Sequence, residues 1–298
     1  MRFRTTIDNV PGFYRVVQAI AQLQKKFVVK FTETEMCVIC ANEINEGGIQ
    51  VWTAVRVSSL FTDYRIQSNA NNQICMTMAA EALLTTLRSA CSPNSNSNNT
   101  MIHNAEVVMK LAKKNERAVL SFEITGQSRN NRDIRVTQDV RIEVLKPQDV
   151  AKMTEPLCPD PDVHIILPPL TKLRTVMDRL KTQSDAVGIR ANNAGRLEIL
   201  VRTDTVATEV RWEGLQNPRL YQASQASETG QRDPERMHGV LVSVKSFMKF
   251  LQSHVVSTTT IACICQNHCL ILYVYIGDMA NSGGVLTFYI PAIMDDTP

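Results

Sequence analysis

The stretch Glu155-Pro156-Leu157-Cys158-Pro159-Asp160-Pro161-Asp162-Val163-His164-Ile165-Ile166-Leu167-Pro168 lies near the midpoint of this 298-residue chain. Its first half contains three prolines and three acidic residues. Proline fixes φ and removes a backbone donor, so this half cannot lie inside a helix or a central strand. The apolar run that follows is typical of a strand. We therefore interpret the first half as an extended connector between two parts of the chain.

The order of elements before the connector resembles the order after it. A strand, an amphipathic helix and three further strands form a unit that occurs four times, beginning near residues 2, 73, 162 and 239. The expected helices cover residues 10–26, 79–90, 169–183 and 244–255, each with apolar residues on one arc. Four helices against many strands predict an α+β fold, with helices on one face of antiparallel sheets. We expect an N-terminal domain over 1–145, a connector over 146–162 and a C-terminal domain over 163–298.

Composition is that of an ordinary globular protein. Hydrophobic residues make up 44% and charged residues 20%, and the net charge is only +3. The total charge therefore predicts no strong preference for nucleic acid or membranes, and no apolar run is long enough to span a bilayer. The opening residues alternate and do not resemble a signal peptide. Eight cysteines spread over the chain indicate reduced thiols in an intracellular protein.

Positive charge is concentrated on the expected helices. In chain order the four helical spans carry net charges of +3, zero, +3 and +2, so the rest of the chain is acidic. These faces are either ordinary solvated surfaces or parts of one surface that contacts a polyanion through its phosphates. Few aromatic residues lie on them, Tyr14 being the nearest case. That argues against base stacking and for contact with the backbone of a duplex.

Two expected strands, at residues 133–145 and 205–213, are long, regularly alternating and last in their units. At the edge of a sheet, such strands have unpaired backbone groups that favour pairing with another chain. The alternative is that both strands are paired inside the chain.

No pattern predicts catalysis, a metal or a cofactor. The chain has no HExxH, P-loop or GxGxxG motif. Cys37 and Cys40 form a lone CxxC whose thiols would point to opposite faces of a strand. The cluster from Cys263 to Cys269 has the wrong spacing for zinc, but a metal- or thiol-dependent enzyme that uses it is the remote alternative. We expect no catalytic residue, no metal and no cofactor.

The whole pattern resembles the eukaryotic sliding clamp family, to which PCNA belongs, and within it the Hus-one family of subunits of the heterotrimeric DNA-damage checkpoint clamp. The resemblance is carried by motifs spread over the chain. They are Met1-Arg2-Phe3-Arg4, Gly47-Gly48-Ile49-Gln50-Val51-Trp52, the connector up to Val163, Leu215-Gln216-Asn217-Pro218-Arg219-Leu220 and Phe288-Tyr289-Ile290-Pro291-Ala292-Ile293. The polar stretch at 92–100 looks like a lineage-specific insertion.

The resemblance implies a PCNA-like fold and a non-enzymatic scaffold in DNA-damage checkpoint signalling and repair. This scaffold would be a ring of three different subunits around duplex DNA. The resemblance also implies three further points: a separate ATP-dependent clamp loader, repair and checkpoint proteins as partners, and a location in the nucleus. It implies no contact with a membrane. The chain is slightly basic where PCNA is acidic, which favours this over the alternative of a homotrimeric polymerase processivity clamp.

The resemblance also implies three sets of site residues. The DNA-facing residues are Arg15, Lys25, Lys26, Arg88, Lys172, Arg179, Lys181, Lys245 and Lys249. The strands that meet neighbouring subunits contribute Ile134, Val136, Val140, Ile142, Val206, Val210 and Trp212. A pocket for partner peptides near the connector contains Met153, Leu157 and Val163.

Overall fold

The computed structural model describes residues 1–41, 48–90, 103–127, 132–218, 233–256, 259–277 and 283–293, without the side chains of 103 and 104. The polar stretch expected at 92–100 and most of the loop expected at 216–238 lie outside these residues. The chain forms two compact units. The first comprises Met1–Cys40, Trp52–Thr154 and Asn281–Val285, and the second comprises Ala41–Val51, Glu155–Ala280 and Leu286–Pro298. The three-part domain division drawn from the sequence stays a prediction.

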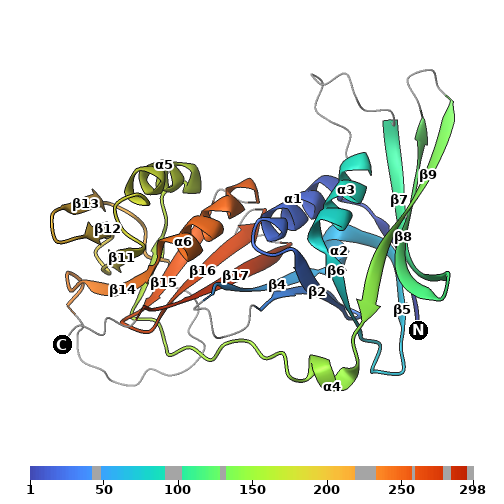
Figure 1. Ribbon diagram of the computed structural model, residues 1–298, viewed down its shortest axis with the longest axis horizontal. Coiled ribbons are helices and arrows are strands. Elements are labelled where there is room, and N and C mark those ends of the chain that lie inside the picture. Colours follow the sequence, from blue (N-terminus) through green and yellow to red (C-terminus); the bar gives the residue numbers. More distant parts are fainter. Residues whose placement is uncertain are drawn as a thin grey trace. The chain divides into compact units, whose positions relative to one another are not determined.

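The first unit is an antiparallel β structure with two longer helices (Figure 1). Its elements are β1 (Arg2–Ile7), α1 (Val10–Ala21), β2 (Lys26–Phe31), β3 (Glu35–Cys40), β4 (Gln50–Arg56), α2 (Val57–Leu60), β5 (Phe61–Gln67), β6 (Ile74–Ala79), α3 (Ala80–Ala90), β7 (His103–Lys114), β8 (Arg117–Gln127), β9 (Asp133–Val144) and α4 (Pro147–Val150). The strand order is β4-β3-β2-β6-β9-β8-β7-β1-β5.

A cluster of phenylalanines forms part of the core of the first unit. Phe31 of β2 lies 4.6 Å from Phe3 of β1, centroid to centroid, and 6.4 Å from Phe61 of β5. Phe13 of α1 packs edge-on against Phe61 at 5.6 Å. The strict alternation of β1 and the apolar arc of α1 thus meet over the same buried face.

The second unit contains two sheets and two longer helices (Figure 1). Its elements are β10 (Val163–Ile166), α5 (Leu170–Leu180), β11 (Ala186–Ala191), β12 (Leu197–Arg202), β13 (Ala207–Trp212), β14 (His238–Ser243), α6 (Val244–Leu251), the 3₁₀ helix η2 (Gln252–Val255), β15 (Thr260–Cys265), β16 (Cys269–Ile276) and β17 (Gly284–Pro291). The strand orders are β13-β12-β11-β14 and β10-β15-β16-β17. Phe250 of α6 packs on Phe288 of β17 at 5.3 Å in the core.

The predicted α+β class is confirmed, and two local predictions are wrong. The first helix was expected to reach Lys26, but α1 ends at Ala21, where the Leu23 amide bonds back to the Ile20 carbonyl in a tighter turn. Strand β5 was not expected at all. It carries a β-bulge: β5 takes three steps from Arg65 to Thr62 where the paired segment of β1 takes two, from Arg4 to Thr6. The extra residue in β5 breaks the alternation.

Helices in the described ranges include none long and apolar enough to cross a membrane.

Candidate functional site

In the first unit, α1 and α3 pack side by side and both carry candidate DNA-facing residues (Figure 1). Arg15 and Arg88 are exposed on these helices. The Tyr14 side chain hydrogen-bonds to Arg88, and this contact raises the pKa of the guanidinium. The contact between Tyr14 and Arg88 therefore joins α1 to α3 at the surface.

Lys25 and Lys26 are exposed but do not lie on a helix. Lys25 follows the end of α1 in a turn, and Lys26 is the first residue of β2. The Ala80 amide donates to the Lys25 carbonyl at 2.9 Å, which holds this turn against the start of α3. The assignment of these lysines to a helix face is therefore wrong, although they stay near the helices.

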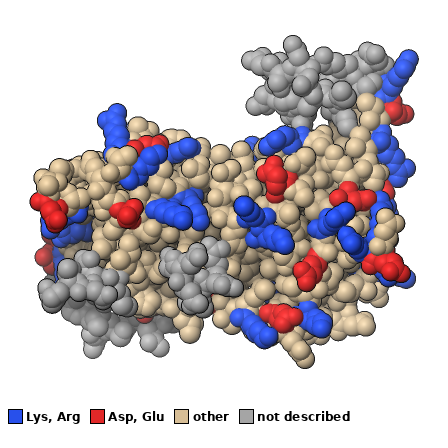
Figure 2. Space-filling model, in the orientation of Figure 1, with Lys and Arg blue, Asp and Glu red and all other residues tan. Residues whose placement is uncertain are grey.

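In the second unit, α5 and α6 pack together and carry the remaining basic candidates. Lys172, Arg179 and Lys245 are exposed, and Lys249 is partly exposed. Lys181 occupies the C-cap position of α5. Its Nζ lies 2.7 Å from Asp178 Oδ1, so part of its charge is already balanced. In each unit, Figure 2 shows lysine and arginine side chains over the helices, with acidic side chains between them.

Strand β9 pairs with β8 along most of its length and with β6 only at its end. Residues 133–141 pair with β8, whereas only Ile142–Val144 pair with β6. Because β6 and β8 are its only neighbours in the described sheet, the first part of β9 has one free edge. Ile134, Val136 and Ile142 are half-buried, but Val140 is only 2% exposed and packs into the core.

Strand β13 is an edge strand, since it ends the order of its four-stranded sheet. Val210 and Trp212 are half-buried on one face. Val206 precedes the strand and is 49% exposed.

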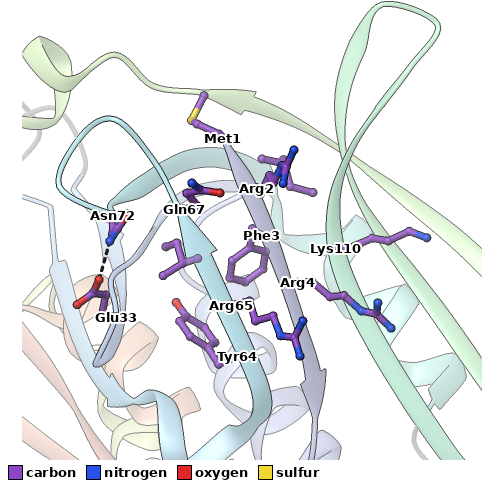
Figure 3. A pocket seen from close by; sticks show the side chains of 12 residues that line it. Met1, Arg2, Phe3, Arg4, Glu33, Tyr64, Arg65, Gln67, Asn72 and Lys110 are labelled. Carbon is purple, nitrogen blue, oxygen red and sulfur yellow. Dashed lines mark hydrogen bonds between the residues drawn. The ribbon is translucent and has the colours of Figure 1, made fainter.

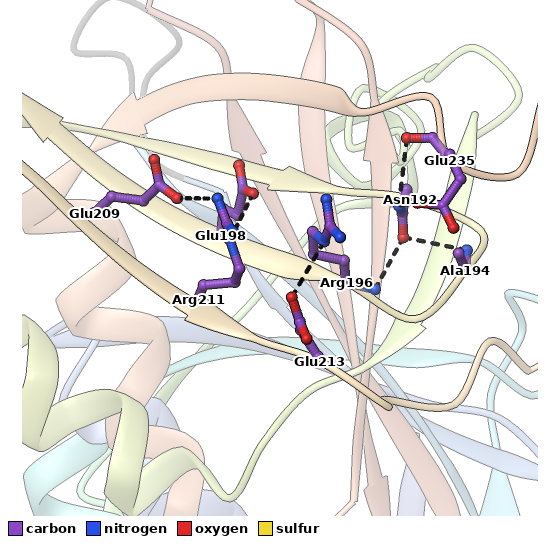
Figure 4. Close-up of polar contacts among 8 residues, drawn as sticks. All are labelled: Asn192, Ala194, Arg196, Glu198, Glu209, Arg211, Glu213 and Glu235. Carbon is purple, nitrogen blue, oxygen red and sulfur yellow. Dashed lines mark hydrogen bonds and ion pairs between the residues drawn. The ribbon is translucent and has the colours of Figure 1, made fainter.

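The other face of β13 is charged (Figure 4). Arg211 lies 3.1 Å from the buried Glu198 of β12 and 2.6 Å from Glu209. The edge strand therefore has one apolar face and one face held by ion pairs.

The connector is bound along the second unit by polar contacts. The Asp162 amide donates to the Ile264 carbonyl at 2.9 Å, and its carboxylate accepts from the Gln266 amide at 2.9 Å. The Cys265 thiol donates to the Pro159 carbonyl, and the Tyr289 hydroxyl donates to Glu155 at 2.6 Å. The proline-rich stretch is thus extended and held by backbone and side-chain bonds.

The three pocket candidates near the connector differ in exposure. Leu157 is 97% exposed and Met153 is partly exposed. Val163 is completely buried in β10, opposite Ile264. It therefore supports the strand and cannot present an open apolar surface.

Tyrosines near the connector were missed by sequence reasoning. Tyr273, Tyr275 and Tyr289 are partly buried and, like Cys158 of the connector, pack against a buried cluster of β15 and β16 residues. Burial raises the pKa of Tyr273 to about 12 and that of Tyr275 above its usual value. The spacing of Tyr273 and Tyr275, two residues apart on one strand, places them on the same face and is the signal that could have found them.

The thiols of the cysteine cluster, Cys263, Cys265 and Cys269, are buried. Burial raises the pKa of Cys263 to about 12 and that of Cys40 to about 12, so both stay protonated at neutral pH. The Cys269 thiol hydrogen-bonds to Cys265, which raises the pKa of Cys269 and lowers that of Cys265. Over the described ranges, no group of three or more His, Cys, Asp or Glu side chains is arranged to hold a metal.

The family model described as Hus1-like protein matches residues 1–294 of the chain. The chain belongs to the Hus1-like family. This Hus1-like chain is 31% identical to Checkpoint protein hus1 of Schizosaccharomyces pombe over 301 aligned residues, covering 99% of the chain and 100% of the relative. It is 26% identical to Checkpoint protein HUS1 of Homo sapiens, with 98% and 100% covered, and 26% identical to the Dictyostelium discoideum homologue, with 99% of each covered.

The fold of this Hus1-like chain is similar to that of Proliferating Cellular Nuclear Antigen from Entamoeba histolytica. The TM-score is 0.69 at 13% identity, and the match covers 98% of the chain and 99% of that structure. The clamp fold predicted from the sequence is therefore confirmed. Family and fold together show that the chain is a clamp-type subunit of the DNA-damage checkpoint. Proteins of this family act as scaffolds.

Proposed function

We propose that this chain is one subunit of a heterotrimeric ring that encircles duplex DNA and acts as a scaffold in checkpoint signalling and repair. One observation carries the proposal: within the described sheets, each unit has a strand with a free edge. These are the first part of β9 and the whole of β13. Two different edges on one chain allow head-to-tail pairing with neighbours, which generates a closed ring when the rotation closes.

The side chains beside these edges support subunit contacts. Val206 exposes 49% of its surface next to the β13 edge, and Val210 and Trp212 extend the same apolar face. A neighbouring strand that pairs with β13 would cover this face and remove it from water. Two partner subunits of the same fold but different sequence would give each edge its own partner.

The helices supply the DNA contact. Arg15 with Arg88 in the first unit, and Lys172, Arg179 and Lys245 in the second, are exposed cations on helix surfaces. Contacts from such side chains to phosphates give affinity without reading sequence, which suits a ring that moves along a duplex. Lys25 in a turn, Lys26 at the start of β2, Lys181 in an ion pair and the partly buried Lys249 add to this charge.

The connector provides the attachment point for other proteins. Leu157 projects almost completely into solvent from a stretch that is otherwise held by hydrogen bonds. A repair or checkpoint peptide would gain an apolar contact there without having to order the loop first. We place the assembly in the nucleus, loaded by a separate ATP-dependent loader, and we assign the chain no catalytic step, metal or cofactor.

The mass of the purified chain tests the assembly. Sedimentation of the chain alone should give no stable trimer, whereas addition of two other clamp-type subunits should give a complex with one copy of each. A stable homotrimer of the chain alone would instead support a processivity clamp of the PCNA type.

A further inference from the structure

The first unit carries a second basic cluster, separate from the helices. Arg4 of β1 lies opposite Arg65 of β5 on one side and opposite Lys110 of β7 on the other. Directly opposite side chains on neighbouring antiparallel strands share a face, with Cβ atoms about 4.5–5.5 Å apart. Figure 3 shows these side chains projecting from three adjacent strands. Arg2 lies two residues before Arg4 and shares its face, so we call Arg2, Arg4, Arg65 and Lys110 the basic row.

The basic row faces away from the helices. The alternate residues of β1, among them Phe3 and Ile7, are buried. Phe3 belongs to the aromatic cluster that Phe13 of α1 joins through Phe61. Arg2 and Arg4 therefore project from the opposite face of the sheet. A duplex bound at α1 and α3 would not neutralise them.

Like charges directly opposite each other destabilise a sheet, and the chain relieves this at one end of the row only. Glu123 of β8 contacts Lys110 and also lies 3.0 Å from Arg135. Over the described ranges, Arg2, Arg4 and Arg65 form no ion pair. Glu33, which lines the same depression, accepts a hydrogen bond from Asn72 at 2.6 Å instead.

The other end of the row lies beside a free strand edge. Strand β5 ends the strand order, so within the described sheet only β1 pairs with it. A depression of about 920 Å³ at this edge is lined by all four residues of the basic row, together with apolar residues that include Leu111. A peptide strand added beside β5 would place one of its side chains directly opposite Arg65.

We propose that the basic row and the free edge of β5 together bind an extended acidic peptide of a partner protein. The peptide adds as a strand to β5 and places a carboxylate or a phosphate opposite Arg65. Arg65 and Arg4 would then contact an anion at one end of the row, as Lys110 contacts Glu123 at the other. Acidic groups at every second position of the peptide follow from the two-residue period of a strand.

A peptide fits this surface better than a nucleic acid. Tyr64 lines the depression, but its hydroxyl donates to the Thr32 carbonyl at 2.6 Å and its ring stands edge-on to Phe3 at 5.6 Å. It therefore offers no free platform on which a base could stack. The amide groups of the β5 edge match a peptide backbone and not a sugar–phosphate backbone.

Fluorescence anisotropy with the full chain tests the proposal. The probes are a short labelled peptide with Glu at every second position, the same peptide with Gln there, one with phosphoserine in place of a central Glu, and a single-stranded oligonucleotide of equal charge. The Glu and phosphoserine peptides should bind and the Gln peptide should not. Arg65→Gln should weaken binding about tenfold or more, as expected for a lost charge-assisted contact. Equal binding of the Glu and Gln peptides would overturn the proposal.

Arg117→Gln is the matched control, because it removes an exposed arginine from β8 of the same unit outside the basic row. It should leave peptide binding unchanged. Tighter binding of the oligonucleotide that is lost in Arg65→Gln would show a nucleic-acid site instead. Because the isolated chain is used, the outcome does not depend on whether the ring assembles.

Two further measurements test strand addition and the unneutralised charge of the basic row. A Glu peptide with N-methylated amides at alternate residues cannot pair with β5 and should lose binding, and undiminished binding would exclude strand addition. Arg65→Gln should also raise the melting temperature of the free chain, because it removes a like-charge neighbour of Arg4. A lowered melting temperature would show that the row is already neutralised inside the chain.

Discussion

At the residue scale, Phe31 shows how one apolar side chain joins separate strands. It is 1% exposed in β2 and touches rings from β1 and β5. Those strands lie far from β2 in the strand order, so the contact is made across the core and not along a ladder. Loss of this ring would leave a cavity between two parts of the sheet.

Phe31→Ala should therefore lower the free energy of unfolding of the chain by about 3–5 kcal/mol. Urea unfolding followed by circular dichroism measures this. Phe31→Leu, which keeps most of the volume, should cost less than about 1.5 kcal/mol. A loss of less than about 1 kcal/mol for the alanine variant would mean that the core closes around the missing ring.

Residue type alone did not predict burial in and beside the connector. Val163 and Leu157 are both apolar residues of one quoted stretch, yet one is completely buried and the other is 97% exposed. Strand pairing decides the difference, because Val163 lies in β10 opposite Ile264 and Leu157 lies in the connector. Likewise, the charge of Lys181 was visible in the sequence, but its ion pair with Asp178 was visible only in the structure.

At the element scale, the position of a strand in its sheet decides its use. The sequence predicted regular strands at 133–145 and 205–213 and left open whether they lie at an edge. In the described sheets, β13 ends its sheet, and β9 pairs with β8 over residues 133–141 and with β6 only over Ile142–Val144. Whether neighbouring subunits pair there stays a prediction.

Val206→Asp tests the β13 edge. In the isolated chain, this exposed position should tolerate the change within about 0.5 kcal/mol of unfolding free energy. In an assembled ring, the new carboxylate would be buried without a partner and should weaken association with partner subunits at least about tenfold. Surface plasmon resonance with the partner subunits measures the association.

Leu157→Asp is the matched control for the edge variant. It makes the same kind of change at the exposed connector residue, so it should leave ring association intact. Equal loss of association in both variants, or in neither, would contradict the assignment of β13 as a subunit contact.

At the scale of the whole molecule, the repeated unit places exposed cations on helices in both halves of the chain. Each compact unit contains two longer helices that pack together, α1 with α3 and α5 with α6. Their exposed arginines and lysines contrast with the weak net charge of +3 for the whole chain. If the proposed ring forms, DNA retention should depend on both units together.

Simultaneous Arg15→Glu, Lys172→Glu and Lys245→Glu should weaken the retention of circular DNA by the assembled ring and leave the chain folded. Loss of three phosphate contacts should reduce the slope of log K against log salt concentration by about three. A control with Lys113→Glu, Arg117→Glu and Arg236→Glu makes the same charge change at exposed residues outside the helices. Equal effects of the two triple variants would show that net charge, and not the helix surface, holds the DNA.

Local patterns in the sequence predicted much of the fold of this protein. Apolar periodicity is a local property of the chain, and it predicted the α+β class, the four helices and most strands. The quoted connector and the motifs at both ends indicated the clamp family. Periodicity failed at β5, because the bulge near Asp63 inserts a residue that breaks the two-residue alternation.

Only the tertiary structure decided which backbone edges and which charges are left free. A strand has the same sequence pattern at the edge or in the middle of a sheet, since pairing depends on neighbours that are distant in the chain. Arg4, Arg65 and Lys110 lie far apart in sequence, so no local pattern could predict that they form one row. The register of three strands brings them together, because hydrogen bonding between distant segments fixes which side chains stand opposite each other.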